Sequence, residues 1–388
     1  MSELAGVGLA ALQEGSRVDF NRLRADRRRR LFDAMAAAEV DVLLLGRPAN
    51  VGFASGARQL WTSGPRPFAP ACVVVAGEQR VHLLSTWDEG VPAEIPHSAL
   101  YGLSWNPAVT VGRLRSIPGV GAARRVGTDG WGPGTGHLLA GLCPDAEAVD
   151  AGILLRRART AKSPDELACI ITAAAVAEAG LTAMAGALRP GVTERELVGV
   201  YAGAVAGLGL SCPPSEGVAW ITTGPGPAGR PRRVATGRAL AEGDLVALNP
   251  GALYAGYEAT VGRTRRVGAG PTPAGGGRAA DALLANRALL DAVIGACRPG
   301  ATGGDLLEVW HSNGGGPLPE PLAWGVGLGV ETPVIGPTLG RDAVVRAGVV
   351  LAVQAWTVHD GVGGVLEQDL VSVGPEGPTV ITRGRSSL

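Results

Sequence analysis

The chain has 388 residues, a length that accommodates two domains, each with its own core. Its 35 basic and 35 acidic residues cancel, so no overall field favours nucleic acid or an acidic membrane surface, and neither is an expected partner. The sequence also lacks an apolar run of the roughly 18 residues that a membrane span needs, and its first residues lack a basic segment followed by an apolar one. We therefore expect a cytoplasmic protein.

The first half of the sequence, residues 1–155, predicts a layered α/β domain. Residues 18–40 repeat apolar side chains at helical spacing, and the arginine run Arg27 to Arg30 within them is interpreted as a solvated helix face. Buried strands are predicted at 40–45, 71–75, 80–84 and directly before Thr128.

The second half, residues 156–388, predicts long helices and the strands between them. Ser163 and Glu166 form a capping box around Pro164, which predicts a helix that runs to about Ala187. Further helices are predicted at 193–208 and 279–297.

Residues 243–267 predict two strands joined by a tight corner. Leu245 to Leu248 form a short buried run, Asn249-Pro250-Gly251 is the predicted turn, and Tyr254 to Thr264 is the returning strand.

The five cysteines show neither Cys-x-x-Cys spacing nor an even count, which argues against a disulfide framework or a zinc cluster. We predict ordinary buried thiols at Cys72, Cys143, Cys169, Cys212 and Cys297.

Several of these stretches resemble the creatinase/aminopeptidase P family, the "pita-bread" hydrolases. The hairpin at 243–267 resembles their Gly-Asp…Asp-x-Gly and Gly-Tyr-x-Ser-Asp-x-Thr-Arg-Thr core, and 47–56 resembles their Pro-x-Asn-x-x-Tyr-Leu-Thr-Gly turn. The resemblance implies an α/β (α+β) fold, with a creatinase-like N-terminal domain and a C-terminal pita-bread domain built on a curved antiparallel sheet. It also implies a homodimer, because the N-terminal domain of the family packs against the partner's catalytic domain.

The metal ligands of the family are replaced in this sequence. Two aspartates, a histidine and two glutamates of the family correspond to Asn249, Thr260, Trp324, Gln354 and Glu367, so that only Glu367 keeps the expected ligand. Because hard cations need charged oxygen ligands, the sequence predicts no metal and no cofactor. Leu248-Asn249 matches creatinase, a member without metal, but Arg232 takes the place of its histidine base and remains protonated.

The resemblance indicates which side chains face the former metal pocket. We predict three catalytic candidates, Glu331, Glu367 and His359. The predicted substrate-binding residues are Arg232, Asn249, Glu258, Thr260, Arg263, Trp324 and Gln354.

Each of the stronger candidates has a structural alternative. For Glu367 it is an internal salt bridge to Arg232 or Arg263, and for Glu331 it is an exposed or ion-paired loop position. For Trp324 the alternative is core filling, for His359 a surface loop, and for Asn249 and Thr260 mutual hydrogen bonding.

The sequence therefore favours a metal-independent enzyme on a creatinase/aminopeptidase P scaffold that acts on a small molecule in specialised or catabolic metabolism. By analogy with creatinase the expected reaction is hydrolysis of a C–N bond or a related reaction that does not cleave peptides. The alternative is a catalytically silent relative of the peptidases that binds a ligand or a partner.

Overall fold

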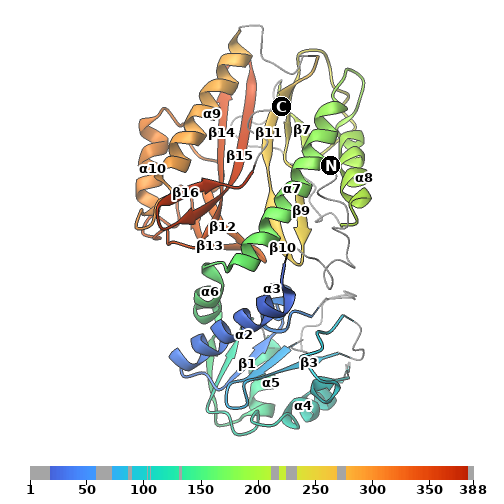
Figure 1. Cartoon of the computed structure of the whole chain (residues 1–388), viewed down its shortest axis with the longest axis vertical. Helices are drawn as coiled ribbons and strands as arrows, with labels where there is room; N and C mark the ends of the chain where they lie inside the picture. Colours follow the sequence, from blue (N-terminus) through green and yellow to red (C-terminus); the bar gives the residue numbers. More distant parts are fainter. Residues whose placement is uncertain are drawn as a thin grey trace. The chain divides into compact units, whose positions relative to one another are not determined.

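The computed structural model describes residues 18–57, 72–85, 90–102, 104, 106–130, 133–210, 218–223, 234–268 and 277–382. It consists of two compact units (Figure 1). One unit is Phe20–Arg159, and the other is Thr160–Leu388 together with the N-terminal residues through Asp19.

The unit Phe20–Arg159 is built on a six-stranded mixed sheet with the strand order β4-β3-β2-β1-β5-β6. Strands β1 and β2 are antiparallel, whereas β5 runs parallel to both β1 and β6. The strands are β1 (Val42–Leu45), β2 (Cys72–Val75), β3 (Arg80–Leu84), β4 (Leu100–Tyr101), β5 (Arg125–Thr128) and β6 (Glu147–Asp150). The helices are α2 (Phe20–Ala37), α3 (Pro48–Ser55), α4 (Pro107–Arg115), α5 (Pro133–Leu142), α6 (Gly152–Thr160) and the 3-10 turn η2 (His97–Ala99).

Two predictions in this unit need correction. The segment predicted as a turn at 47–56 is the helix α3, with a proline at its first turn and Gly56 in the left-handed conformation as its C-cap. The arginine run is only partly solvated, because Arg27 is 3% exposed and its guanidinium donates to the carbonyl oxygen of Gly52 at 3.4 Å.

The second unit is built on an eight-stranded sheet with the order β13-β12-β14-β15-β11-β8-β7, with β16 paired to β15. A separate two-stranded sheet contains β9 and β10. The strands are β7 (Ala219–Ile221), β8 (Leu245–Leu248), β9 (Gly251–Tyr254), β10 (Tyr257–Thr260), β11 (Gly262–Arg266), β12 (Ala323–Gly327), β13 (Gly329–Ile335), β14 (Val350–His359), β15 (Gly363–Gly374) and β16 (Gly377–Val380). The helices are α7 (Pro164–Gly186), α8 (Glu194–Gly207), α9 (Arg278–Ala296) and α10 (Gly303–Ser312).

Strand alternation gives the large sheet two chemically different faces. On the helix-covered face, Val353, Ala355, Val371 and Val373 pack with residues of α9 and α10 in one core. The opposite side of the same strands, which we call the inner face, carries Gln354 and Gln368. Figure 1 shows α9 and α10 beside β14 and β15, and α7 and α8 beside β7, β9 and β10.

The hairpin predicted at 243–267 reverses at a different point. The chain does not turn back at Asn249-Pro250-Gly251, which instead links β8 of the large sheet to β9 of the small one. The reversal occurs at Ala255 and Gly256, whose φ angles of 52° and 83° allow a two-residue turn between the paired Tyr254 and Tyr257. The arms of one long hairpin are therefore β8 with β9 and β10 with β11, and the predicted corner at 249–251 lies within the first arm.

Helix α7 supports that hairpin. Its capping box, Ser163 with Glu166, is present as predicted, and the same Glu166 carboxylate accepts a hydrogen bond of 2.6 Å from the Tyr257 hydroxyl on β10. Among the described residues α7 is the one helix long and apolar enough to cross a membrane, but 56% of its apolar window is buried within the protein. It packs on α8, β9 and β10, as a core helix does.

Candidate functional site

The inner face presents a row of uncharged polar side chains across three strands. Gln354 of β14 lies directly opposite Gln368 of β15, which in turn lies opposite Gly262 of β11. Asn249 follows directly after β8 and completes the row. Because residues directly opposite each other in antiparallel strands share a face, the amides all point to the inner side of the sheet. We call Gln354, Gln368, Gly262 and Asn249 the amide row.

The amide row is held together by hydrogen bonds. The Asn249 side-chain nitrogen donates to the Gln368 side-chain oxygen and to the Val261 carbonyl, both at 3.1 Å. The Gln368 nitrogen donates in turn to the hydroxyl of Thr260. Gly262 makes this approach possible, since a Cβ there would lie 2.9 Å from the Cβ of Gln368. Asn249 and Thr260 are thus linked through Gln368, which forms a separate hydrogen bond with each of them, instead of bonding to one another.

Gln368 corrects the position assigned to Glu367. In the register of β14 and β15, Gln354 faces Gln368, whereas Glu367 faces Ala355 of the helix-covered core. The family pattern Arg-Ile-Glu-Asp-x-Val-x-Val also fits one residue later, with Gln368 at the glutamate, Asp369 at the aspartate and Val371 and Val373 at the valines. Sequence reasoning missed Gln368, although this spacing could have found it.

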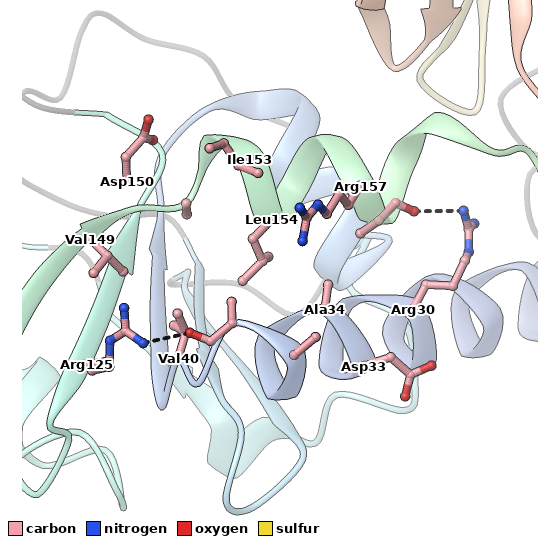
Figure 2. Close-up of a pocket in the computed structure, with 14 residues that line it drawn as sticks. Arg30, Asp33, Ala34, Val40, Arg125, Val149, Asp150, Ile153, Leu154 and Arg157 are labelled. Carbon is pink, nitrogen blue, oxygen red and sulfur yellow. Dashed lines mark hydrogen bonds between the residues drawn. The ribbon is translucent and has the colours of Figure 1, made fainter. Parts of the chain in front are cut away.

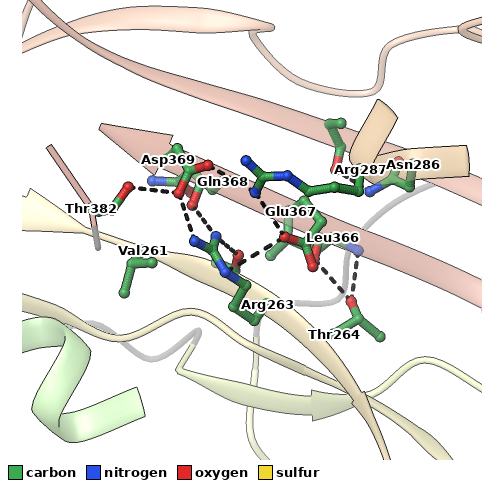
Figure 3. A network of polar contacts seen from close by, with 12 residues as sticks. Val261, Arg263, Thr264, Asn286, Arg287, Leu366, Glu367, Gln368, Asp369 and Thr382 are labelled. Atoms are coloured by element: carbon green, nitrogen blue, oxygen red, sulfur yellow. Dashed lines mark hydrogen bonds and ion pairs between the residues drawn. The ribbon is translucent and has the colours of Figure 1, made fainter. Parts of the chain in front are cut away.

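Glu367 instead belongs to a buried ion network on the helix-covered face (Figure 3). Its carboxylate lies 3.6 Å from the Arg263 guanidinium and 3.5 Å from that of Arg287 on α9. Asp369, fully buried, pairs with the same two arginines at 2.6 and 2.9 Å and accepts from the Thr382 hydroxyl at 2.6 Å. The structural alternative for Glu367, a salt bridge to Arg263, is the arrangement that the structure shows.

The two acids of this network differ in pKa. Burial raises the pKa of Glu367, against the opposing effect of the neighbouring arginines. Burial also acts to raise the pKa of Asp369, but Arg263, the Thr382 hydroxyl and Arg287 outweigh it and hold that pKa below its usual range. Asp369 is thus the anchoring anion of the network.

His359 and Arg263 also lie away from the inner face. The His359 ring lies 2.9 Å from the hydroxyl of Thr357, which is 2.8 Å from the Asn286 side chain on α9. Arg263 lies opposite Glu367 on the neighbouring strand. The structure therefore does not bring these two predicted site residues to Asn249 and Thr260.

Trp324 and Glu331 lie on different faces of the sheet. Glu331 lies opposite Gly325 of β12, which lies opposite Leu351 of the helix-covered core. Trp324 of β12 is half-buried and lies opposite Ala352 of β14, on the same side as Gln354. The Glu331 carboxylate forms a 2.7 Å ion pair with Lys162 and accepts from the backbone N–H of Leu328 at 3.2 Å. These contacts commit the Glu331 carboxylate to Lys162 and Leu328, which disfavours it as a general base.

Glu258 is a carboxylate on the same face of β10 as Thr260. It alternates with Tyr257 and Ala259, which are buried toward α7, so it shares the opposite face of β10 with Thr260. No described residue forms a hydrogen bond or ion pair with its half-buried carboxylate. Burial raises the pKa of Glu258 above its usual value.

The remaining predicted residues are placed as follows. The Gln354 side-chain nitrogen donates to the Pro321 carbonyl at 2.7 Å and lies 3.3 Å from the Glu320 carboxylate. Arg232 lies outside the described residues, as does Cys212. The other four cysteines are buried free thiols, as predicted.

A pocket in the other unit is a weaker candidate (Figure 2). It has a volume of about 310 Å³ and lies between α2, β6 and α6. Two of its arginines are committed to backbone carbonyls, Arg30 to Ala158 at 2.9 Å and Arg125 to Ala38 at 3.0 Å. These hydrogen bonds stabilise the local fold. They do not indicate which ligand the pocket would bind.

Comparison with known proteins identifies the family. The profile of metallopeptidase family M24 matches residues 168–375, more than half of the chain, and the creatinase/prolidase N-terminal domain matches residues 27–161. The chain therefore belongs to metallopeptidase family M24, with a creatinase-like N-terminal domain and a pita-bread domain. No curated protein sequence matches it significantly.

Solved structures support the same fold. The prolidase from Pyrococcus horikoshii OT3 is 19% identical with a TM-score of 0.76, covering 93% of this chain and 99% of that one. The Xaa-Pro dipeptidase from Bacillus anthracis is 20% identical with a TM-score of 0.74, covering 94% and 99%. The dipeptidase PepE from Mycobacterium ulcerans is 21% identical with a TM-score of 0.73, covering 95% and 97%.

The residues at the family's metal positions do not fit a pair of divalent cations. The row that should supply carboxylates supplies amides, with Thr260 and Trp324 at the remaining positions. Neutral amide oxygens do not offset the charge of paired cations, and indole offers no ligand atom. Within the described ranges, no three His, Cys, Asp or Glu side chains gather as a metal site.

Proposed function

We propose that this chain is a metal-independent enzyme on the M24 scaffold that acts on a small molecule, by hydrolysis of a C–N bond or a related reaction other than peptide cleavage. The observation that carries the proposal is the amide row itself. Asn249, Gln354 and Gln368 keep the shape of Asp and Glu and lose only the charge. Buried amides contribute less to core packing than apolar side chains do, so their retention on one face favours a role in binding a polar ligand.

Glu258 is the proposed proton-transfer group. A general acid or base works best when its pKa lies near the working pH, and burial shifts this carboxyl in that direction. Asn249, Thr260, Gln354 and Gln368 would orient the substrate by hydrogen bonds, with Trp324 as an aromatic wall.

The first test is metal content and cofactor dependence. We expect protein purified without chelator to contain no stoichiometric metal, and to leave Xaa-Pro dipeptides uncleaved after manganese, cobalt or zinc is added. Stoichiometric metal together with cleavage would overturn the proposal, because it would require ligands other than those in the amide row.

The second test is turnover of a panel of creatine-like guanidino compounds, amides and lactams. For a substrate found in this panel, we expect Glu258→Gln to lower kcat by about a hundredfold or more, the range that general acid–base catalysis contributes, while binding persists. The exposed Glu308→Gln on α10 is the matched control and should retain full turnover. Equal kcat values for the two variants would exclude Glu258.

A silent binding protein is the second candidate function. It is favoured by the hydrogen bonds among Asn249, Gln368 and Thr260. These bonds commit the side chains to one another and leave few donors to assist a reaction. Ligand binding that persists without any turnover, in both the native chain and Glu258→Gln, would support it.

We further propose a cytoplasmic homodimer, as the family resemblance implies. Sedimentation velocity at micromolar concentration would measure the assembly.

A further inference from the structure

The inner face carries a second row beside the amide row. Trp356 of β14 lies opposite Leu366 of β15, and Trp220 of β7 lies opposite Ala247 of β8. Thr264 of β11 joins the two halves, because it faces Ala247 and exchanges hydrogen bonds of 2.7 and 3.0 Å with the backbone of Leu366. We call these five residues the indole row.

The two rows are direct neighbours. Trp356 and Leu366 lie two residues along their strands from Gln354 and Gln368, on the same face. Trp220, Ala247, Trp356 and Leu366 form one buried apolar cluster. An uncharged polar row thus adjoins an apolar one.

Both indole nitrogens in this cluster are unsatisfied. Trp220 is 1% and Trp356 is 7% exposed, and neither buried N–H has a hydrogen-bond acceptor within the part of the chain that the structure describes. Buried donors in native proteins nearly always have a partner, so two orphan N–H groups on one face require an explanation. Trp310 on α10 shows the usual arrangement, since its indole N–H donates to the Gly316 carbonyl at 2.8 Å.

We propose that Trp220 and Trp356 form a specificity subsite that binds an uncharged carbonyl group attached to a small apolar body. This proposal names a substrate class for the proposed function and rests on it. Indole N–H groups donate only, so the ligand must supply an acceptor.

The lack of charge in the two rows determines which kind of hydrogen-bond acceptor they can bind. No side chain of the amide row or the indole row is ionisable, and Arg263 and Arg287 lie on the helix-covered face. Among the described residues neither row offers a counter-ion, so a carboxylate bound here would lose its hydration with its charge uncompensated. An amide, lactam or imide carbonyl carries no charge that needs compensation. The class is therefore a neutral amide-type compound, unlike the zwitterionic dipeptides.

The test observes the indole N–H signals by ¹⁵N NMR, with Trp220→Phe and Trp356→Phe used to assign them. We expect millimolar benzamide, hydantoin or 2-pyrrolidinone to shift at least one of the two signals downfield, as formation of a hydrogen bond does. Benzoate and toluene, which respectively add a charge and lack an acceptor, should leave both unchanged. A shift with benzoate alone, or with none of the neutral carbonyl compounds, would overturn the proposal.

A replacement that removes only the N–H separates binding from packing. Benzothienylalanine at position 220 or 356 should leave the melting temperature of the free protein unchanged or raised, and weaken binding of the responding amide by about two- to tenfold. The same replacement at Trp310 is the control, with a lowered melting temperature and unchanged binding. If the three positions behave alike, the subsite is wrong.

These outcomes are independent of turnover. Indole shifts without any turned-over amide would retain the subsite and reject the enzyme, whereas Glu258-dependent turnover without indole shifts would do the reverse.

Discussion

The site differs from a metal centre by very few atoms. At three positions of the inner face an amide stands where the family resemblance places an acid, and each replacement exchanges one oxygen for nitrogen. Shape and hydrogen-bonding capacity survive, while the charge that attracts cations is removed. Replacement of acids by amides of the same shape thus explains how the fold is kept although the charged metal ligands of the family are absent.

Restoring the acids should restore cation binding. We expect the variant Asn249→Asp/Thr260→Asp/Trp324→His/Gln354→Glu/Gln368→Glu to bind manganese or zinc, measured by calorimetry, where the native chain binds none. The repelling carboxylates should also make this variant less stable without metal than with it.

The control variant retains Gln368 and carries the other four changes. It tests the alternative frame, in which Glu367 is the fifth ligand. We expect much weaker cation binding, because Glu367 lies on the helix-covered face. Equal affinity in both variants would contradict the assignment of Gln368.

The sequence predicted four of the side chains that the structure places at the inner face, but it assigned the fifth position to the wrong residue. Asn249, Thr260, Trp324 and Gln354 were placed by motif, and the structure puts all four on the inner face or at its edge. Glu367 failed because a strand has a period of two, so an error of one residue moves a side chain to the opposite face. No motif indicated the ion pair of Glu331 with Lys162, which lies 169 residues away.

Strands β11 and β15 are joined to helix α9 by charge. Asp369 is fully buried between Arg263 and Arg287, so its removal leaves two guanidinium groups without their main anion. We expect Asp369→Ala to lower the free energy of unfolding by about 3–5 kcal/mol, as measured by urea denaturation.

Asp291 provides a matched comparison on the same arginine. It pairs with Arg287 at 2.8 Å but is 48% exposed, so Asp291→Ala should cost less than about 1 kcal/mol. Similar losses for both variants would show that burial does not determine the strength of this network.

Element boundaries were predicted best where local chemistry is explicit. The capping boxes at Ser163 and Thr193 set the starts of α7 and α8 correctly. The hairpin corner was misplaced because Asn-Pro-Gly is a strong turn pattern, whereas Ala255-Gly256 is a weak one that the pairing of Tyr254 with Tyr257 enforces.

Acid sensitivity of the whole molecule should originate in the creatinase-like domain. His82 on β3 is 2% exposed and lies 5.8 Å from the Tyr101 ring, and its two ring nitrogens have no hydrogen-bond partner among the described residues. Burial lowers its pKa, with Arg80 acting in the same direction and Glu78 against it. The folded state therefore favours neutral His82.

The sign of the pH effect follows from this direction. As pH falls below about 6.5, the unfolded chain binds a proton at His82 before the folded chain does, so stability is lost. Urea denaturation at pH 7.5 and 5.5 should show this loss, and His82→Leu should reduce it. An unchanged difference between the two pH values in the variant would place the effect elsewhere.

The overall architecture was predictable because the motifs of this family are spread along nearly the whole chain. The motif after β1, the capping box of α7 and the hairpin at 243–267 each specify a place in one known topology. Function was less predictable, because substrate choice depends on the few residues of the inner face that depart from that pattern.

The amide row also determines how many base changes separate this chain from the family's ligand set. Each codon for asparagine or glutamine differs from a codon for the corresponding acid by a single base, so one base change at each of these positions would restore an acid. A tryptophan codon, in contrast, shares no base position with a histidine codon, and Trp324 occupies the histidine place. Restoring the family's ligands would therefore take single-base changes at the amides but a change at all three codon positions of Trp324, which makes that indole the largest genetic step toward a metal site.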